Sequence, residues 1–147
     1  MLVYSVEEGV MYADTQRTVR DVIVSTSAYK FHKITTPEYG ECILGSEFFD
    51  GDLSNLVRAV SLGQVTPDSE ATGLLQVIDT KETYYVTAAG DVHRLHGGTD
   101  IHVMGSNAEA CGMTALVRGA KLPVEQAMRC MFLVSSLSGG DVVSTKY

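Results

Sequence analysis

Two side chains of opposite charge stand at the ends of strand-like segments near the N-terminus. Asp14 closes the segment Val10–Asp14, and Lys30 closes the segment Val22–Lys30, sixteen residues further along. Runs rich in β-branched and aromatic residues of this kind predict strands. A carboxylate and an ammonium on adjacent strands can form an ion pair, which persists when partly buried because losing one partner leaves the other charge unpaired. The residues alone therefore predict a structural ion pair between Asp14 and Lys30.

Two serines occupy glycine-containing turns in the second half of the chain. Ser106 lies in Gly105-Ser106-Asn107, between a strand-like segment and a helical one. Ser106 or Asn107 is therefore interpreted as a helix N-cap, since both side chains can accept a hydrogen bond from a free backbone N–H. Ser138-Gly139-Gly140 is interpreted as the C-terminal stop of a helix.

Three histidines, His93, His96 and His102, raise the hypothesis of a metal site, because zinc is held by three or four His, Cys or carboxylate ligands. His93 and His96 straddle the end of a predicted strand, and neither a CxxC nor an HExxH motif accompanies them. The segment Gly97–Asp100 lacks the lysine of a phosphate-binding loop and is predicted to be a turn. We expect no metal and no cofactor.

The composition indicates one globular domain over residues 1–147. Of the 147 residues, 45% are apolar and 20% are charged, and no apolar stretch reaches the ~18 residues of a membrane span. No secretory leader pattern opens the chain, so we expect a cytoplasmic protein. The net charge of −7 and the dispersed basic residues disfavour nucleic acid or a membrane surface as partner. Cys42, Cys111 and Cys130 lack CxxC spacing and are expected to be reduced core thiols.

The predicted elements follow the order sheet, helix, sheet, two helices and strand. An opening hairpin over residues 2–13 precedes strands at 19–27, 29–35 and 41–45. Apolar spacing of three to four residues predicts a helix over 47–62, with Gly63 as its stop and a loop over 64–72. A meander over 73–95 and a strand at 101–104 precede helices over 107–119 and 122–137 and a last strand at 141–145. This order indicates a layered α+β domain.

The segments around Asp14 and Lys30, together with Lys30–Ile34 and Ile101–Ser106, resemble the core of proteasome β-type subunits and of the bacterial HslV peptidase. The resemblance extends over nearly the whole chain. It implies the four-layer αββα sandwich of N-terminal-nucleophile hydrolases. One departure is the loop over 64–72, where members of that family place a second long helix.

In that family an N-terminal threonine attacks the substrate, and a Lys held by an Asp lowers the proton affinity of the attacking group. The family-equivalent positions here are Asp14, Lys30, Ser106 and Ser138, with Gly45 at the backbone amide of the oxyanion hole. Ser135 replaces the family's distal Asp. The threonine has no counterpart, because the family's interval places it about two residues before Met1. The resemblance thus implies a retained scaffold without its nucleophile, and no residue is assigned a catalytic role.

Three functions are compatible with these residues. The first is a non-catalytic protein that self-assembles into homo-oligomeric rings, with six or seven subunits per ring or a double ring, as the resemblance implies. The second is an active threonine-type peptidase or other amidohydrolase with an unusual Ser, Thr or Cys nucleophile near Lys30. The third is a module that binds a peptide or small ligand in the inherited cleft. We expect the first, in a subunit whose compact size would suit a bacterium or a phage.

Overall fold

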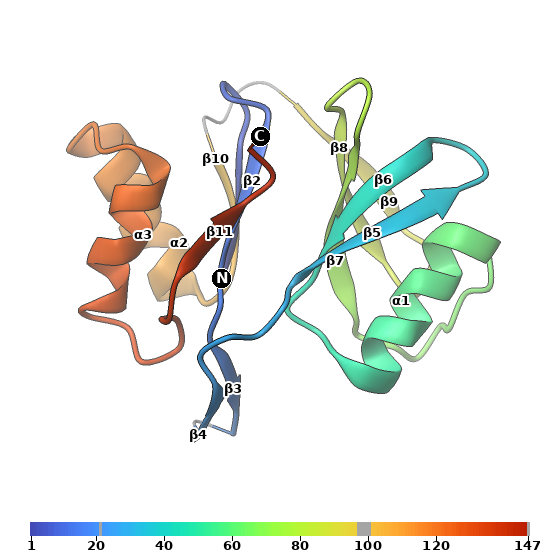
Figure 1. Cartoon of the computed structure of the whole chain (residues 1–147), viewed down its shortest axis with the longest axis horizontal. Coiled ribbons are helices and arrows are strands. Elements are labelled where there is room, and N and C mark those ends of the chain that lie inside the picture. Colours follow the sequence, from blue (N-terminus) through green and yellow to red (C-terminus); the bar gives the residue numbers. More distant parts are fainter. Residues whose placement is uncertain (21, 97–100, 147) are drawn as a thin grey trace. The chain divides into compact units, whose positions relative to one another are not determined.

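The computed structural model describes residues 1–20, 22–96 and 101–146. The chain divides into two compact units, one formed by residues 1–29 with 97–147 and the other by residues 30–96. Each unit combines an antiparallel sheet with helix, as Figure 1 shows. The mixed strand and helix content predicted from the sequence is therefore confirmed, and every strand pairing among the described residues is antiparallel.

The first unit is built on a four-stranded sheet of order β10-β1-β2-β11. Its strands are β1 (Leu2–Ser5), β2 (Val10–Asp14), β10 (Ile101–Met104) and β11 (Val142–Ser144). The turn between β1 and β2 ends at Gly9, which has a φ of 66°, a backbone conformation that glycine adopts without steric cost. The predicted opening hairpin is thus confirmed. Every residue of β1 and β2 is buried, so this hairpin forms the centre of the unit.

Three helical segments pack against one face of this sheet: α2 (Asn107–Thr114), the π-helical turn η1 (Ala115–Gly119) and α3 (Val124–Phe132). Helix α3 is amphipathic, since its buried residues recur at three- and four-residue spacing. These residues are Val124, Ala127, Met128 and Met131. They share a hydrophobic core with Val3 and Tyr12 of the sheet and with Met113 of α2.

Helix α3 ends five residues earlier than the sequence predicted. The apolar spacing continues to Leu137, but the helix stops at Phe132, and Leu133 and Val134 are 86% and 80% exposed. The chain after Phe132 turns back toward the end of β2, where the backbone of Gly139 is hydrogen-bonded. Apolar periodicity could not locate this end, because it does not reveal where the chain leaves the core.

A second correction concerns the strand predicted over residues 19–27. The structure instead forms a two-stranded hairpin from β3 (Arg17–Val19) and β4 (Val22–Ser25). Arg20, between the two strands, has a φ of 48°, the left-handed conformation of a tight turn. A continuous β-branched run was therefore mistaken for a single strand, because the reversal has no glycine or proline to mark it.

The second unit is a five-stranded meander of order β5-β6-β7-β8-β9 with helix α1 inserted between β6 and β7. The elements are β5 (Phe31–Thr36), β6 (Gly40–Gly45), α1 (Asp50–Leu62), β7 (Thr72–Val77), β8 (Thr83–Thr87) and β9 (Val92–Leu95). Gly63 ends α1 as predicted, with a φ of 69° and its N–H bonded to the Ala59 carbonyl. Leu56 of α1 is fully buried in a core with Leu44 and Leu75.

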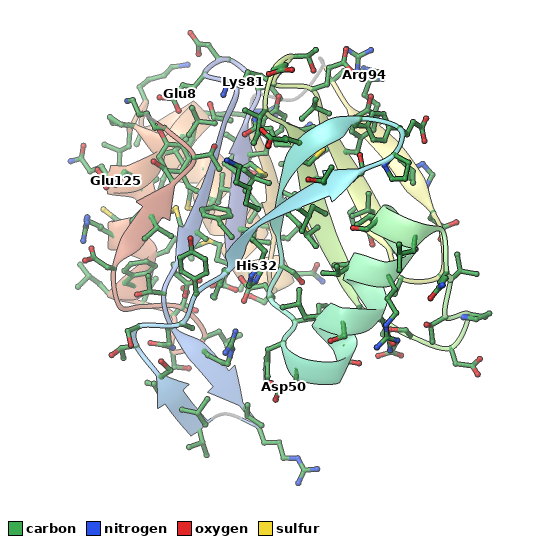
Figure 2. The ribbon with its side chains drawn as sticks, turned by 45° about the vertical axis from the view of Figure 1, so that its right-hand side comes forward. Glu8, His32, Asp50, Lys81, Arg94 and Glu125 are labelled. Atoms are coloured by element: carbon green, nitrogen blue, oxygen red, sulfur yellow. The ribbon has the colours of Figure 1, made fainter. Side chains whose placement is uncertain are left out.

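Charged side chains line the surface of both units. Glu125 on α3 and Arg94 on β9 point outward from the ribbon, as Figure 2 shows. None of the helices in the described ranges has the length and apolar content that a membrane crossing requires.

Candidate functional site

Asp14, the last residue of β2, is fully buried and is held by two donors from its own unit. Its Oδ1 lies 2.7 Å from the Met1 ammonium nitrogen, and its Oδ2 accepts a hydrogen bond of 3.0 Å from the Gly139 N–H. Both the Met1 ammonium and the Asp14 side chain are 0% exposed. Because a buried carboxylate is costly unless it is paired and hydrogen-bonded, these two contacts explain how Asp14 can lie in the core.

Strand register places these donors beside Asp14. β1 pairs with β2 so that Leu2 is opposite Ala13, which brings residue 1 next to residue 14. On the other side β11 pairs with β2, with Val142 opposite Asp14, and the residues before β11 therefore pass close to the same carboxylate. Asp14 could be recognised from the sequence, but its partners Met1 and Gly139 could not, since their proximity follows from strand pairings across the whole unit.

The Ser138-Gly139-Gly140 segment packs closely against the end of β2. It is not the helix stop predicted for it, because α3 already ends at Phe132. Thr15 Oγ1 accepts the Asp141 N–H at 2.7 Å and donates to the Thr26 carbonyl at 2.7 Å. A Cβ on Gly140 would meet Thr15 Oγ1, and the residue has a φ of 77°, so glycine is required there on both grounds. Ser138 is 2% exposed, and its Oγ has no hydrogen-bond partner among the described residues.

Ser106 is the N-cap of α2, as its position in the sequence predicted. Its Oγ accepts the Glu109 N–H at 3.1 Å, and Glu109 Oε1 in return accepts the Ser106 N–H at 3.1 Å. This reciprocal pair is a capping box, which satisfies two N–H groups that a helix start leaves free. The Ser106 hydroxyl is thereby engaged in a structural role.

In the second unit, Lys30 is almost completely buried at 1% exposure. Its Nζ lies 3.0 Å from Oε2 of Glu47, and its carbonyl accepts the Ser46 N–H at 2.9 Å. Nothing in the sequence pattern marked Glu47 as a partner. Lys30 and Asp14 belong to different units, so the ion pair predicted between them stays a prediction.

Gly45 ends β6, opposite Phe31 on one side and Leu74 on the other. A Cβ on the neighbouring Gly73 would lie only 2.6 Å from the Gly45 carbonyl oxygen, so the backbones of β6 and β7 approach closely here. Ser135, which replaces the family's distal Asp, lies just after α3 and accepts the Leu137 N–H through its hydroxyl at 3.2 Å.

The described cysteines differ in how far they are buried. Cys42 is buried, and burial raises the pKa of its thiol, which disfavours the nucleophilic thiolate. Cys111 is exposed, so the expectation that all three cysteines are core thiols is wrong for that residue.

His93 packs against the Tyr85 ring and His102 against the Tyr4 ring. Within residues 1–20, 22–96 and 101–146, no three His, Cys, Asp or Glu side chains are grouped to hold a metal, and Gly97–Asp100 lies outside those residues.

Comparison with known proteins gives a structural likeness only. No protein-family model matches the sequence, and no curated protein matches it. Among solved structures, the chain is similar to the eukaryotic HslV of Trypanosoma brucei, with a TM-score of 0.66 and 17% sequence identity. The match covers 97% of this chain and 96% of that chain. The chain therefore has an HslV-like fold, as the resemblance implied.

Proposed function

We propose that this chain is a non-catalytic, HslV-like protein that self-assembles into homo-oligomeric rings. The observation that carries the proposal is the engagement of Asp14, whose buried carboxylate is bound by the Met1 ammonium and the Gly139 N–H. Catalysis by acyl transfer needs an attacking atom that a substrate can reach. Of the two serines matched to the family site, Ser106 uses its hydroxyl as a helix cap, and Ser138 is buried where a substrate would have to displace surrounding residues to reach it.

Exposed apolar residues in the first unit support the self-assembly part of the proposal. Ile23 and Val24 of β4 are 52% and 55% exposed, and Leu133 and Val134 after α3 are more exposed still. Gln16 links the β3–β4 hairpin to the chain after α3, because its Nε2 donates to Thr18 Oγ1 of β3 at 3.2 Å and to the Ser136 carbonyl at 2.9 Å. A two-stranded hairpin such as β3–β4 is marginal without further packing, and apolar surface of this kind favours an interface.

Intact-mass and native mass spectrometry of the purified protein test both parts on one sample. We expect a retained Met1 and particles of six, seven, twelve or fourteen subunits, the orders implied by the family resemblance. A monomer would refute self-assembly. A chain trimmed to a new N-terminal Ser or Thr would refute the non-catalytic assignment.

Substitutions then locate the interface. Leu133→Glu and Ile23→Glu place a charge in the two exposed apolar segments, and each is expected to reduce the subunit number. Leu62→Glu is the matched control, because Leu62 is 65% exposed at the end of α1 in the other unit. Loss of the oligomer in the control as well would show that the effect is non-specific.

An active amidohydrolase is the second candidate, and one observation favours it. Ser138 adjoins the Gly139 amide that binds Asp14, and its buried hydroxyl has no hydrogen-bond partner among the described residues. Incubation with a hydroxyl-reactive probe followed by peptide mapping distinguishes the two functions. We expect no labelling of Ser138, whereas stoichiometric labelling lost in Ser138→Ala would favour the hydrolase.

The proposal retains two further predictions from the sequence. The four-layer αββα sandwich remains an implication of the resemblance, supported by the HslV likeness along the chain. A cytoplasmic location is the second of these predictions, and it is kept as part of the proposal.

A further inference from the structure

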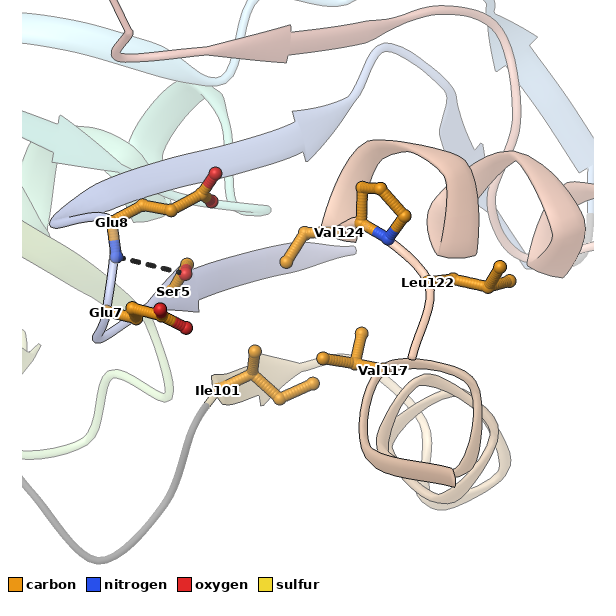
Figure 3. Close-up of a pocket in the computed structure, with 8 residues that line it drawn as sticks. Ser5, Glu7, Glu8, Ile101, Val117, Leu122 and Val124 are labelled. Atoms are coloured by element: carbon orange, nitrogen blue, oxygen red, sulfur yellow. Dashed lines mark hydrogen bonds between the residues drawn. The ribbon is translucent and has the colours of Figure 1, made fainter. Parts of the chain in front are cut away.

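A cavity of about 230 Å³ lies in the first unit, between the β1–β2 turn and the connection from η1 to α3. Its two sides differ in chemistry, as Figure 3 shows: Glu7 and Glu8 of the turn lie on one side, and Ile101, Val117, Leu122 and Val124 lie across from them. Ile101 and Val124 are buried core residues, so the apolar side is firmly packed. A small molecule inside would therefore meet carboxylates at one end and aliphatic carbon at the other.

The two glutamates are exposed, and their carboxylates have no counter-charge in the part of the chain that the structure describes. Among the described residues neither Glu7 nor Glu8 forms an ion pair with a lysine, an arginine or the N-terminus. Glu125 in the first turn of α3 is close enough to Tyr12 to help raise its pKa, and it adds a third acidic group to this region. Arg129 lies 3.7 Å from Glu125. Two adjacent unpaired negative charges at a concave site attract a cation and repel an anion.

Two partly buried hydrogen bonds hold Glu8 in place, although the residue itself is exposed. The Tyr12 hydroxyl donates to Glu8 Oε2 at 2.9 Å, and Ser5 Oγ accepts the Glu8 backbone N–H at 3.4 Å. Burial, followed by the hydrogen bond to Glu8, raises the pKa of Tyr12 to about 12, so this donor keeps its proton at neutral pH. The second oxygen of Glu8 is left for another donor.

Ser5 supplies a polar group inside the cavity. The residue is 5% exposed and lines the cavity beside both glutamates. A hydroxyl has two acceptor lone pairs and one proton, and the described residues use only one lone pair of Ser5, for the Glu8 N–H. Ser5 can therefore accept a hydrogen bond from a ligand at the carboxylate end.

We propose that this cavity binds an amphipathic organic cation, an aliphatic amine or guanidine whose head is held by Glu7, Glu8 and Ser5. Its carbon chain lies against Ile101 and Val117. A hydrated divalent metal fits less well, because it seeks six or more oxygen ligands and half of this wall is aliphatic. A neutral apolar molecule would cover the carboxylates without pairing them, which is unfavourable.

A series of ligands with matched chains tests the head group. Pentylamine, 1-pentanol and hexanoate are titrated into the full-length protein, with the methyl groups of Ile101, Val117 and Val124 followed by NMR. We expect pentylamine alone to shift these signals, with a dissociation constant on the order of 1 mM for so small a ligand. Binding should weaken several-fold in 0.3 M salt. Equal binding of 1-pentanol, or amine-induced shifts confined to other methyl groups, would overturn the proposal.

Substitutions in the cavity complete the test. Glu7→Gln and Glu8→Gln are each expected to weaken pentylamine binding about two- to fivefold, and Val117→Phe should abolish it by filling the space. Glu70→Gln is the matched control, since Glu70 is an exposed glutamate of the other unit. Amine binding that is unchanged in both cavity glutamine variants would overturn the assignment, with unperturbed spectra elsewhere showing that the variants are folded.

The same chemistry is available from a free amine or from a lysine side chain. A short capped peptide with one lysine is therefore titrated beside pentylamine. Tighter binding of the peptide would support the site and assign its cation to a polypeptide partner. Tighter binding of pentylamine would support the site and assign it to a free small molecule.

Discussion

Replacing Asp14 by asparagine removes one charge from a buried ion pair while changing the side-chain shape very little. The wild-type carboxylate accepts from the Met1 ammonium at 2.7 Å and from the Gly139 N–H at 3.0 Å, at 0% exposure. Asparagine retains one oxygen for Gly139. Its amide group, however, would face the ammonium with a second donor or with an uncharged oxygen, and the buried cation would lose the carboxylate that lies 2.7 Å from it.

The size of the effect follows from this burial. Breaking a buried ion pair by removing one partner costs about 3–5 kcal/mol, because the remaining charge is neither solvated nor paired. With a urea dependence of about 2 kcal/mol per molar, a loss of this size lowers the unfolding midpoint by roughly 1.5–2.5 M. The exposed pair between Asp141 and Arg129, at 3.1 Å, provides the control, since solvent screens both partners. Asp141→Asn should leave the midpoint nearly unchanged.

Urea unfolding followed by circular dichroism at pH 7 measures both variants. Protein concentration must be fixed, because self-association would make the apparent stability depend on it. A midpoint for Asp14→Asn equal to that of Asp141→Asn would refute the reasoning. If Asp14→Asn does not fold, Asp14→Glu, which keeps the charge, should recover part of the structure, and equal failure of both variants would also count against an electrostatic cause.

Three further changes probe other parts of the structure. The pKa of Tyr12 is raised to about 12, from about 10 in an unfolded chain, so the unfolded state loses this proton first and the free energy of unfolding should fall between pH 10 and 12. Tyr12→Phe should reduce that fall, as measured by urea titrations. An identical fall in both proteins would contradict the assignment. Ser106→Ala should lower the free energy of unfolding by about 1 kcal/mol through loss of the α2 cap, and Ser106→Asp should retain most of the wild-type stability because aspartate can also cap. Equal urea midpoints for the two variants would argue against a capping role. Gly73→Ala should destabilise the protein by roughly 1–3 kcal/mol and lower its thermal midpoint, because the new Cβ would lie 2.6 Å from the Gly45 oxygen. Gly51→Ala is the control and should not lower the midpoint, because a Cβ at that position has no atom within 4 Å.

The local sequence pattern was sufficient to predict several helices and strands and one residue of the candidate site, Ser106. The β1–β2 hairpin, helix α1 with its stop at Gly63 and the start of α3 near Pro123 all follow from periodicity and turn residues. The capping role of Ser106 followed in the same way, since an N-cap contacts backbone only three residues ahead. These features depend on neighbours within a few residues, and the order of the residues therefore reports on them directly.

The surroundings of the charged residues were decided by the tertiary structure. Asp14 meets Gly139 across 125 residues of sequence, and Lys30 meets Glu47 across 17, so neither partner could be recognised from local pattern. The end of α3 at Phe132 likewise depends on where the chain must return to β2. The amino-acid sequence by itself determined the type of most segments and the positions of Asp14 and Lys30 at strand ends, but not the β3–β4 reversal or the end of α3. Strand register and burial, which are properties of contacts between distant segments, decided which of those charges are paired and which remain open to a ligand.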